Sequence, residues 1–347
     1  MRYFILLCVT LSLSACAQKK NQKQKPKMYN IENYLEEGSK NITVDNFVTK
    51  IIENKKSYDS EPLYYLRINK QMCLIEVFVN GVLILQDNEL SNYVTPHEIN
   101  YSIFKSGEQT VTIKMYPVEN LINESFGREG TPITELQDNS SVAIKVVKID
   151  NRSNKGFEDE ALVTTHQSPT NSNGAFIATG KPYYEYSFTF NAKVPYEFEG
   201  SAKGQDLRKL NQDLVTKKAL EFYKMSQQII VNKDLESWLK LNYFFNKRTQ
   251  AASYSTEKDF NELLEEYKEE LSRNYTAIPI KEYKLEFRGE GKLVVLKHTS
   301  TDPFYKRELA LVLKYTDEDG DLSSYFPGVV LYLPEGRSLE EGLMMWK

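Results

Sequence analysis

The sequence predicts a two-domain protein in which an all-β sandwich is followed by an α+β domain with helices on an antiparallel sheet. Between residues 72 and 198, apolar side chains repeatedly alternate with polar ones, which is the period of a half-buried strand. From residue 205 the apolar residues recur at helical spacing, and from residue 280 the period of two returns. A chain of 347 residues is long enough for two such domains. We place the sandwich in residues 41–200 and the α+β domain in residues 205–347.

Residues 1–15 have the features of a secretory signal peptide. The apolar run of residues 3–13 is shorter than the roughly 20 residues that a membrane-spanning helix needs. The run ends in Leu13-Ser14-Ala15-Cys16, which resembles the lipobox of bacterial lipoproteins. The resemblance implies cleavage before Cys16 and acylation of Cys16, which would attach the protein to a membrane. The alternative is an ordinary signal peptide with an incidental cysteine.

The residue after the cysteine is Ala17, and not the aspartate that retains enterobacterial lipoproteins at the inner membrane. The resemblance therefore implies the outer membrane, with the folded part on its periplasmic or outer face. Residues 16–40 are predicted to be a lysine-rich tether, because five lysines and no acidic residue lie between Ala17 and Lys27. Loss of Arg2 with the signal peptide changes the formal net charge of −4 to −5. This charge argues against a general nucleic-acid binder.

Three cysteines are present in the chain, and they fit export. Cys8 lies in the signal peptide and Cys16 is the predicted lipidation site, so Cys73 has no partner for an intramolecular disulfide. Cys73 shares the strand parity of Ile75 and Val77. We expect it to be a buried, inert thiol and not a nucleophile.

The clearest strand signal is a hairpin around Asn80-Gly81. Two apolar runs flank this dipeptide, which suits a type I′ turn because both central residues need a positive φ. The turn would pair Val79 with Val82, Phe78 with Leu83, and Val77 with Ile84. Further strands are expected at residues 99–103, 111–115, 142–146 and 184–198. The sandwich would be immunoglobulin-like or jelly-roll-like.

Shorter signals precede and interrupt these strands. Residues 30–37 and 45–55 are predicted to be short helices, the second capped by Asp45. Residues 118–140 and 150–182 are polar and are expected to be long loops, where recognition is concentrated in many folds. The glycine-bounded segment 200–204 is predicted to be a hinge.

Three helices and a run of strands are predicted after the hinge. The helices start near Asp206, at Asp234 as an N-cap, and at Thr256. Strands are expected around residues 283–287, 293–295, 309–315, 329–333 and 343–346. In this order of elements, residues 205–347 loosely resemble NTF2-like and cystatin-like α+β folds, a resemblance that carries no motif.

Several residues invite a chemical interpretation that their spacing does not support. The acidic segment 317–321 has glycine in its fourth position, whereas a calcium-binding EF-hand loop has it in the sixth, so a solvated turn is favoured. His97, His166 and His298 form no zinc motif. Glu197 and Glu199 share one strand parity and could face a cleft, but such pairs are common on solvated strands.

No catalytic, metal-binding or cofactor-binding residue is assigned from the sequence, and Cys16 is the one site residue, for lipidation. The leading hypothesis is a non-enzymatic, membrane-anchored lipoprotein of the bacterial envelope that binds a protein or an envelope ligand. One alternative is an immunity protein that neutralises a toxin directed at the periplasm. Others are an envelope glycan or lipid hydrolase with a site hidden from sequence reasoning, and a subunit of an envelope complex.

Overall fold

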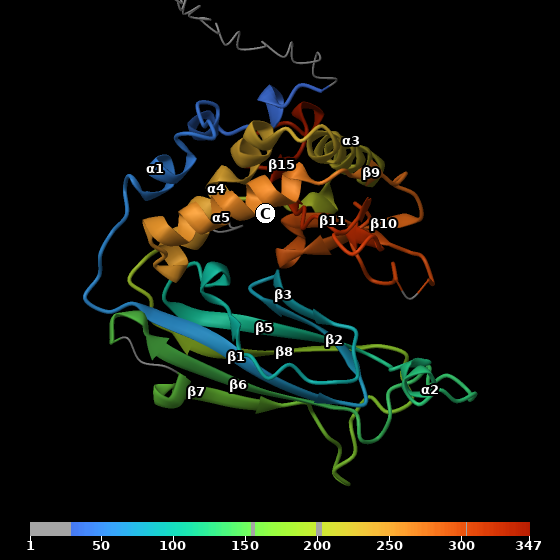
Figure 1. Cartoon of the computed structure of the whole chain (residues 1–347). Helices are drawn as coiled ribbons and strands as arrows, with labels where there is room; N and C mark the ends of the chain where they lie inside the picture. Colours follow the sequence, from blue (N-terminus) through green and yellow to red (C-terminus); the bar gives the residue numbers. More distant parts are fainter. Residues whose placement is uncertain (1–28, 154–156, 199–202, 303) are drawn as a thin grey trace, which may run out of the picture. The chain divides into compact units, whose positions relative to one another are not determined.

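Residues 62–192 form two four-stranded antiparallel sheets, which we call the sandwich-like region. The computed structural model describes residues 29–153, 157–198, 203–302 and 304–347. The strand orders are β4-β1-β6-β7 and β3-β2-β5-β8. All of these strands except β4 are labelled in Figure 1. The strands are β1 (Pro62–Gln71), β2 (Leu74–Val79), β3 (Val82–Asp87), β4 (His97–Glu98), β5 (Gly107–Tyr116), β6 (Ser141–Asp150), β7 (Ala161–Gln167) and β8 (Tyr184–Ala192). The predicted β-rich N-terminal region is therefore present.

The two sheets share one hydrophobic core, which the alternation of apolar residues explains. Val111 and Ile113 on β5 are buried against Ile144 and Val146 on β6, which belongs to the other sheet. Strand β2 differs from its neighbours because all six of its residues are buried, including Glu76. One face of β2 meets the shared core, so the other face must be covered by a different part of the chain.

The Asn80-Gly81 turn joins β2 to β3 as predicted. Asn80 has a φ of 49° and Gly81 a φ of 80°, the left-handed backbone that a type I′ turn requires. Val79 pairs with Val82 across the turn. The sequence signal for this hairpin was therefore sufficient.

The register of this hairpin slips beyond its first two pairs. Phe78 pairs with Leu83 as predicted, but Val77 faces Leu85 and not Ile84. The register shifts between Val77 and Phe78, so β3 carries one extra residue at Ile84. The predicted pairing of Val77 with Ile84 is wrong, because no residue pattern in this hairpin indicates a bulge.

Other strand predictions differ at their ends. Residues 99–103 are not a strand but contain a 3-10 turn at Asn100–Ser102. The long alternating run from residue 184 ends its strand at Ala192. The predicted loop at 150–182 contains the edge strand β7, and the predicted loop at 118–140 contains the short helix α2 (Leu121–Ser125). Strand β1 was not predicted, although it is the central partner of both β4 and β6.

Residues 31–52 pack against the helices and not against the sandwich-like region. The predicted helix at 30–37 is replaced by two 3-10 turns, Glu32–Tyr34 and Glu37–Ser39, and Ile31 and Leu35 are buried. The part of the predicted tether from residue 31 onward is therefore folded. Helix α1 (Phe47–Ile52) begins after Asn46, and not after the predicted cap Asp45. Its apolar face packs on α4 and α5, so residues 41–52 do not belong to the sandwich as predicted.

Helices and small sheets follow in residues 205–347, which we call the C-terminal region. The helices are α3 (Gln212–Val231), α4 (Leu235–Ser253) and α5 (Glu257–Ser272). Asp206 caps a 3-10 turn before α3, while Asp234 caps α4 as predicted. Thr256 and Asp259 form a capping box at the start of α5, so this predicted start is also confirmed.

Two antiparallel sheets accompany these helices. Their strand orders are β10-β11-β14-β15 and β13-β12-β9, and α3 contacts both β9 and β11. The strands are β9 (Thr276–Ala277), β10 (Tyr283–Arg288), β11 (Leu293–His298), β12 (Leu313–Thr316), β13 (Leu322–Tyr325), β14 (Leu331–Tyr332) and β15 (Met344–Met345). The α+β character predicted for this region is thus observed, with the strands divided between two sheets.

The sandwich-like and C-terminal regions belong to one contact unit, residues 31–347. Val82 of β3 is buried with Leu293, Val295 and Trp346, and this cluster covers part of the second sheet. Their division into two independent domains stays a prediction. Among the residues that the structure describes, no helix combines the length and apolarity needed to cross a membrane.

Candidate functional site

A cleft of about 890 Å³ lies between the second sheet of the sandwich-like region and the turn that joins β10 to β11. The sheet contributes the outward-facing side chains of β2, β5 and β8, and the C-terminal region contributes Arg208 and residues 287–292. Lysine and arginine side chains outnumber glutamates in the described lining. The cleft is therefore a polar site with a positive bias, built by segments that are distant in the sequence.

The sheet wall of the cleft presents hydroxyl groups at alternating positions. Thr110 and Thr112 of β5 line the cleft, and the Thr112 Oγ1 atom lies 2.8 Å from the Oγ of Ser187 on β8. Thr189 donates a hydrogen bond of 3.2 Å to Glu108 on β5. These side chains point outward because the alternate residues of β5 fill the core.

The opposite wall is the β10–β11 turn, whose backbone touches the sandwich-like region. Gly289, Glu290 and Gly291 all have positive φ values, so the chain reverses tightly. A Cβ atom on Gly81 would lie 2.2 Å from the Cα of Gly289. Because no side chain fits there, the two hairpin turns meet backbone to backbone in the lining of the cleft.

Two cations lie over the ring of Phe78 in the lining. The Nζ of Lys114 is 4.8 Å from the ring centroid, and the Cζ of Arg288 is 5.4 Å from it. Arg288 is only 7% exposed, and its Nε donates a 3.0 Å hydrogen bond to Glu286. The ring and the carboxylate together fix the guanidinium group.

A buried ion cluster lies behind these cations. The Nζ of Lys297 on β11 donates to Glu76 of β2 and lies 3.6 Å from Glu286. Burial opposes ionisation of Glu286, but the charges of Arg288, Lys297 and Lys114 hold its pKa below the ordinary value. An isolated buried charge would be strongly destabilising, so each member depends on the others. The cluster links the second sheet to the C-terminal region.

No protein-family model, no curated protein and no solved structure matches this chain.

The three histidines lie on different strands and outside the lining of the cleft. His97 is on β4, His166 on β7 and His298 on β11, and each packs against an aromatic ring. Burial lowers the pKa of all three rings. Within the described residues, no group of three or more His, Cys, Asp or Glu side chains is arranged to hold a metal ion.

The other residues singled out from the sequence have structural surroundings. Cys73 is 1% exposed and burial raises the pKa of its thiol to about 12, which fits an inert thiol. Asp317 accepts hydrogen bonds from Asp321 N and from Ser323 within the β12–β13 turn, so the acidic segment is a hairpin turn. Glu197 lines the cleft, whereas Glu199 lies outside the described residues, as do Cys16 and most of the predicted hinge.

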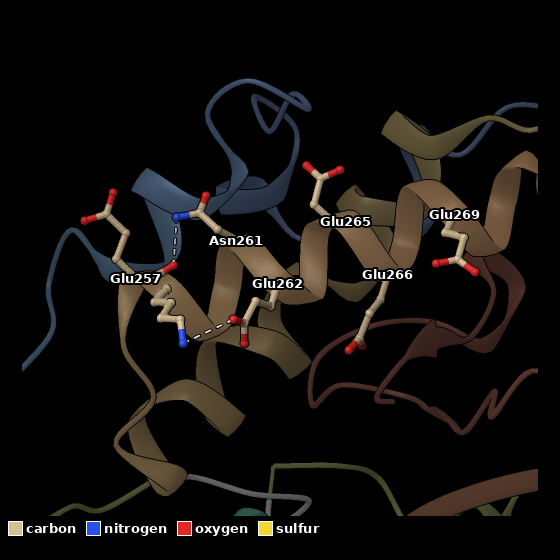
Figure 2. A pocket seen from close by; sticks show the side chains of 7 residues that line it. Glu257, Asn261, Glu262, Glu265, Glu266 and Glu269 are labelled. Atoms are coloured by element: carbon tan, nitrogen blue, oxygen red, sulfur yellow. Dashed lines mark hydrogen bonds and ion pairs between the residues drawn. The ribbon is translucent and has the colours of Figure 1, made fainter.

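A second hollow, of about 740 Å³, follows the outer face of α5 (Figure 2). One helix supplies its whole lining, which consists of five glutamates with Lys258 and Asn261. Lys258 pairs with Glu262 at 3.4 Å, and both side chains are well exposed. This surface is the solvated face of an amphipathic helix, and it carries no further assignment.

Sequence reasoning missed the central residues of the cleft and of the ion cluster behind it. Glu76 is the one charged residue in the run Leu74–Val79, and a charge within an apolar strand was a usable signal for a buried ion pair. Lys114 and Arg288 gave no comparable signal, because isolated basic residues are common on strands. Their convergence on Phe78 depends on Arg288, which lies 210 positions from Phe78 in the chain.

Proposed function

We propose that this protein is a lipid-anchored binding protein of the bacterial envelope, and that the cleft is its binding site. The lipobox-like sequence ending at Cys16 supports the anchor and the localisation. The convergence of Lys114 and Arg288 on Phe78 within the cleft is the observation that carries the binding site. The finer architecture, two domains of which the first is immunoglobulin-like or jelly-roll-like, is part of the same proposal.

Binding is favoured over catalysis by the way the charged groups of the cleft are held. Arg288 is fixed by Glu286 and by the Phe78 ring, and Glu108 accepts from Thr189. Groups held by neighbours in this manner are preorganised to recognise a ligand. The hydrolase hypothesis required acids or histidines that converge in one pocket. The three histidines lie outside this lining, and of the glutamates in it Glu108 accepts from Thr189 and Glu185 accepts from Tyr183.

Site-specific photo-crosslinking in cells tests the binding site. A photoreactive amino acid replaces Thr110 inside the cleft, and in a matched control it replaces Lys145 on the outward-facing side of β6 in the other sheet. We expect a discrete adduct from the Thr110 position and none from Lys145. Equal labelling at both positions, or no adduct at either, would contradict a binding site in the cleft. A protein adduct would favour the immunity-protein alternative.

A further inference from the structure

Arg288 is positioned to bind an anionic group. Its Nε donates to Glu286. The residue lines the cleft, although only 7% of its surface is exposed. In the described part of the chain, no hydrogen bond from its two Nη atoms to another side chain is present. A guanidinium group held in this way offers parallel N–H donors that match a carboxylate or a phosphate.

Lys114 adds a second positive charge beside the same ring. Its Nζ lies 4.8 Å from the Phe78 centroid and the Cζ of Arg288 lies 5.4 Å from it, and both residues line the cleft. Glu286 lies behind them and interacts with both, so the two like charges are tolerated. An anion that enters the cleft would be attracted by both cations, since both lie in its lining.

The rest of the cleft is too large for a simple anion and suits a sugar. Its volume of about 890 Å³ leaves room for several further ligand groups. Thr110 and Thr112 offer hydroxyls, and Glu185 offers a carboxylate that can accept from a sugar hydroxyl. Phe104 and Phe287, which are partly exposed, offer apolar surface for the C–H face of a sugar ring.

An extended peptide fits this cleft less well. Strand β5 pairs with β2 on one side and with β8 on the other, so its main-chain groups are already used. A peptide that binds by strand addition needs a free sheet edge, and this wall is the face of a sheet. Recognition at this wall therefore comes from side chains, which suits a saccharide.

We infer that the cleft binds a saccharide that carries a carboxylate or phosphate group, with Arg288 and Lys114 holding the anion and the hydroxyl-bearing face of β5 contacting the ring. This inference rests on the proposed function and names its ligand class.

Calorimetric titration of the purified folded chain tests it with defined probes. The ligands are D-glucuronate, D-glucose 6-phosphate, neutral D-glucose, inorganic phosphate and triglutamate. We expect at least one of the two acidic sugars to bind about tenfold or more tightly than glucose, a difference of about 1.4 kcal/mol. The stronger of the two acidic sugars identifies the anionic group. Affinity should also fall with added salt, because part of it is electrostatic.

Variants locate the binding. Lys114→Gln should lower the affinity for the acidic sugar about tenfold. Lys145→Gln, on the other sheet, should leave this affinity unchanged. Arg288→Lys keeps the charge but removes the paired N–H donors of the guanidinium group, so it should also weaken binding. A thermal transition of this variant shows that it is folded.

Some results would overturn the inference. One is equal affinity for glucose and for the acidic sugars. Another is tighter binding of triglutamate or inorganic phosphate than of the acidic sugars. A third is an affinity for the acidic sugar that does not change in Lys114→Gln. If a crosslinked adduct forms at Thr110 and any of these results is also obtained, the cleft is a binding site but its ligand is not an acidic sugar. The absence of the adduct would instead reject the proposed function.

Discussion

Gly81 shows how a single residue can serve two purposes. Its φ of 80° completes the type I′ turn, and its missing side chain allows the contact with Gly289. The first requirement is local and can be read from the Asn-Gly pair. The second depends on a turn more than 200 residues away in the chain, and no sequence pattern reports it.

Alanine substitutions separate these two requirements. Gly174 also has a φ of 80°, but a Cβ there would meet no atom within 4 Å. Gly174→Ala should therefore lower the free energy of unfolding by about 1 kcal/mol, from backbone strain alone. Gly81→Ala should lose about 3 kcal/mol or more, since overpacking against Gly289 adds to the strain. Denaturant unfolding measures both losses, and equal losses would mean that the turns separate readily.

At the scale of elements, strand β4 and the end of helix α4 are joined through a partly buried carboxylate. Ser253 near the end of α4 donates a hydrogen bond to Glu98 of β4. Burial raises the pKa of Glu98, and the bond from Ser253 offsets only part of that shift. An acid with a raised folded-state pKa penalises the folded state once it ionises. Stability is thus reduced above the folded pKa, and the penalty is absent below the unfolded pKa of about 4.3.

Glu98→Gln should consequently stabilise the protein at neutral pH. The glutamine can still accept from Ser253 but carries no charge that must be desolvated. Calorimetry should show a higher Tm than wild type at pH 7, with the difference fading toward pH 4. Glu318→Gln, in the exposed β12–β13 turn, is the control. It should leave the Tm unchanged both at pH 7 and near pH 4. A lower Tm for Glu98→Gln at pH 7 would show that the ionised form is favoured in the fold.

Local signals predicted the elements well where a single segment decides the outcome. The caps at Asp234 and Thr256, the Asn80-Gly81 turn and the strand at 142–146 all depend on residues close in sequence. The errors occur where another segment decides. Strand β7 lies in a polar stretch and forms because β6 offers it a free edge.

At the scale of the whole molecule, the site also depends on contacts between distant segments, which local sequence signals do not report. Residues 31–52 were assigned to the tether and the sandwich, because nothing in their sequence shows that α1 would pack on α4 and α5. Of the cleft, only Glu197 was singled out from the sequence as a residue that could face one. Lys114, Arg288 and Phe78 come together only when the sheet and the β10–β11 turn meet.

The predicted anchor concerns the whole molecule as well. Cys16→Ala should release the protein from membranes and abolish labelling by a palmitate analogue, because acyl chains on Cys16 would supply the attachment. Fractionation of cells and in-gel detection of the label measure both effects. Cys8→Ala, within the predicted signal peptide, is the matched control and should remain attached and labelled. Membrane retention of Cys16→Ala without label would contradict the anchor.

The Asn80-Gly81 turn also bears on the chemical lifetime of the protein. An asparagine followed by glycine cyclises readily to a succinimide, because glycine hinders the attack of its own nitrogen very little. Here the Asn80 amide donates to Ser102 O and to Gln109, and its oxygen accepts from Thr110 N. The folded turn therefore restrains the group that would have to rotate. Deamidation would remove both donors at once, so ageing of the chain would begin by loosening the hairpin that lines the cleft.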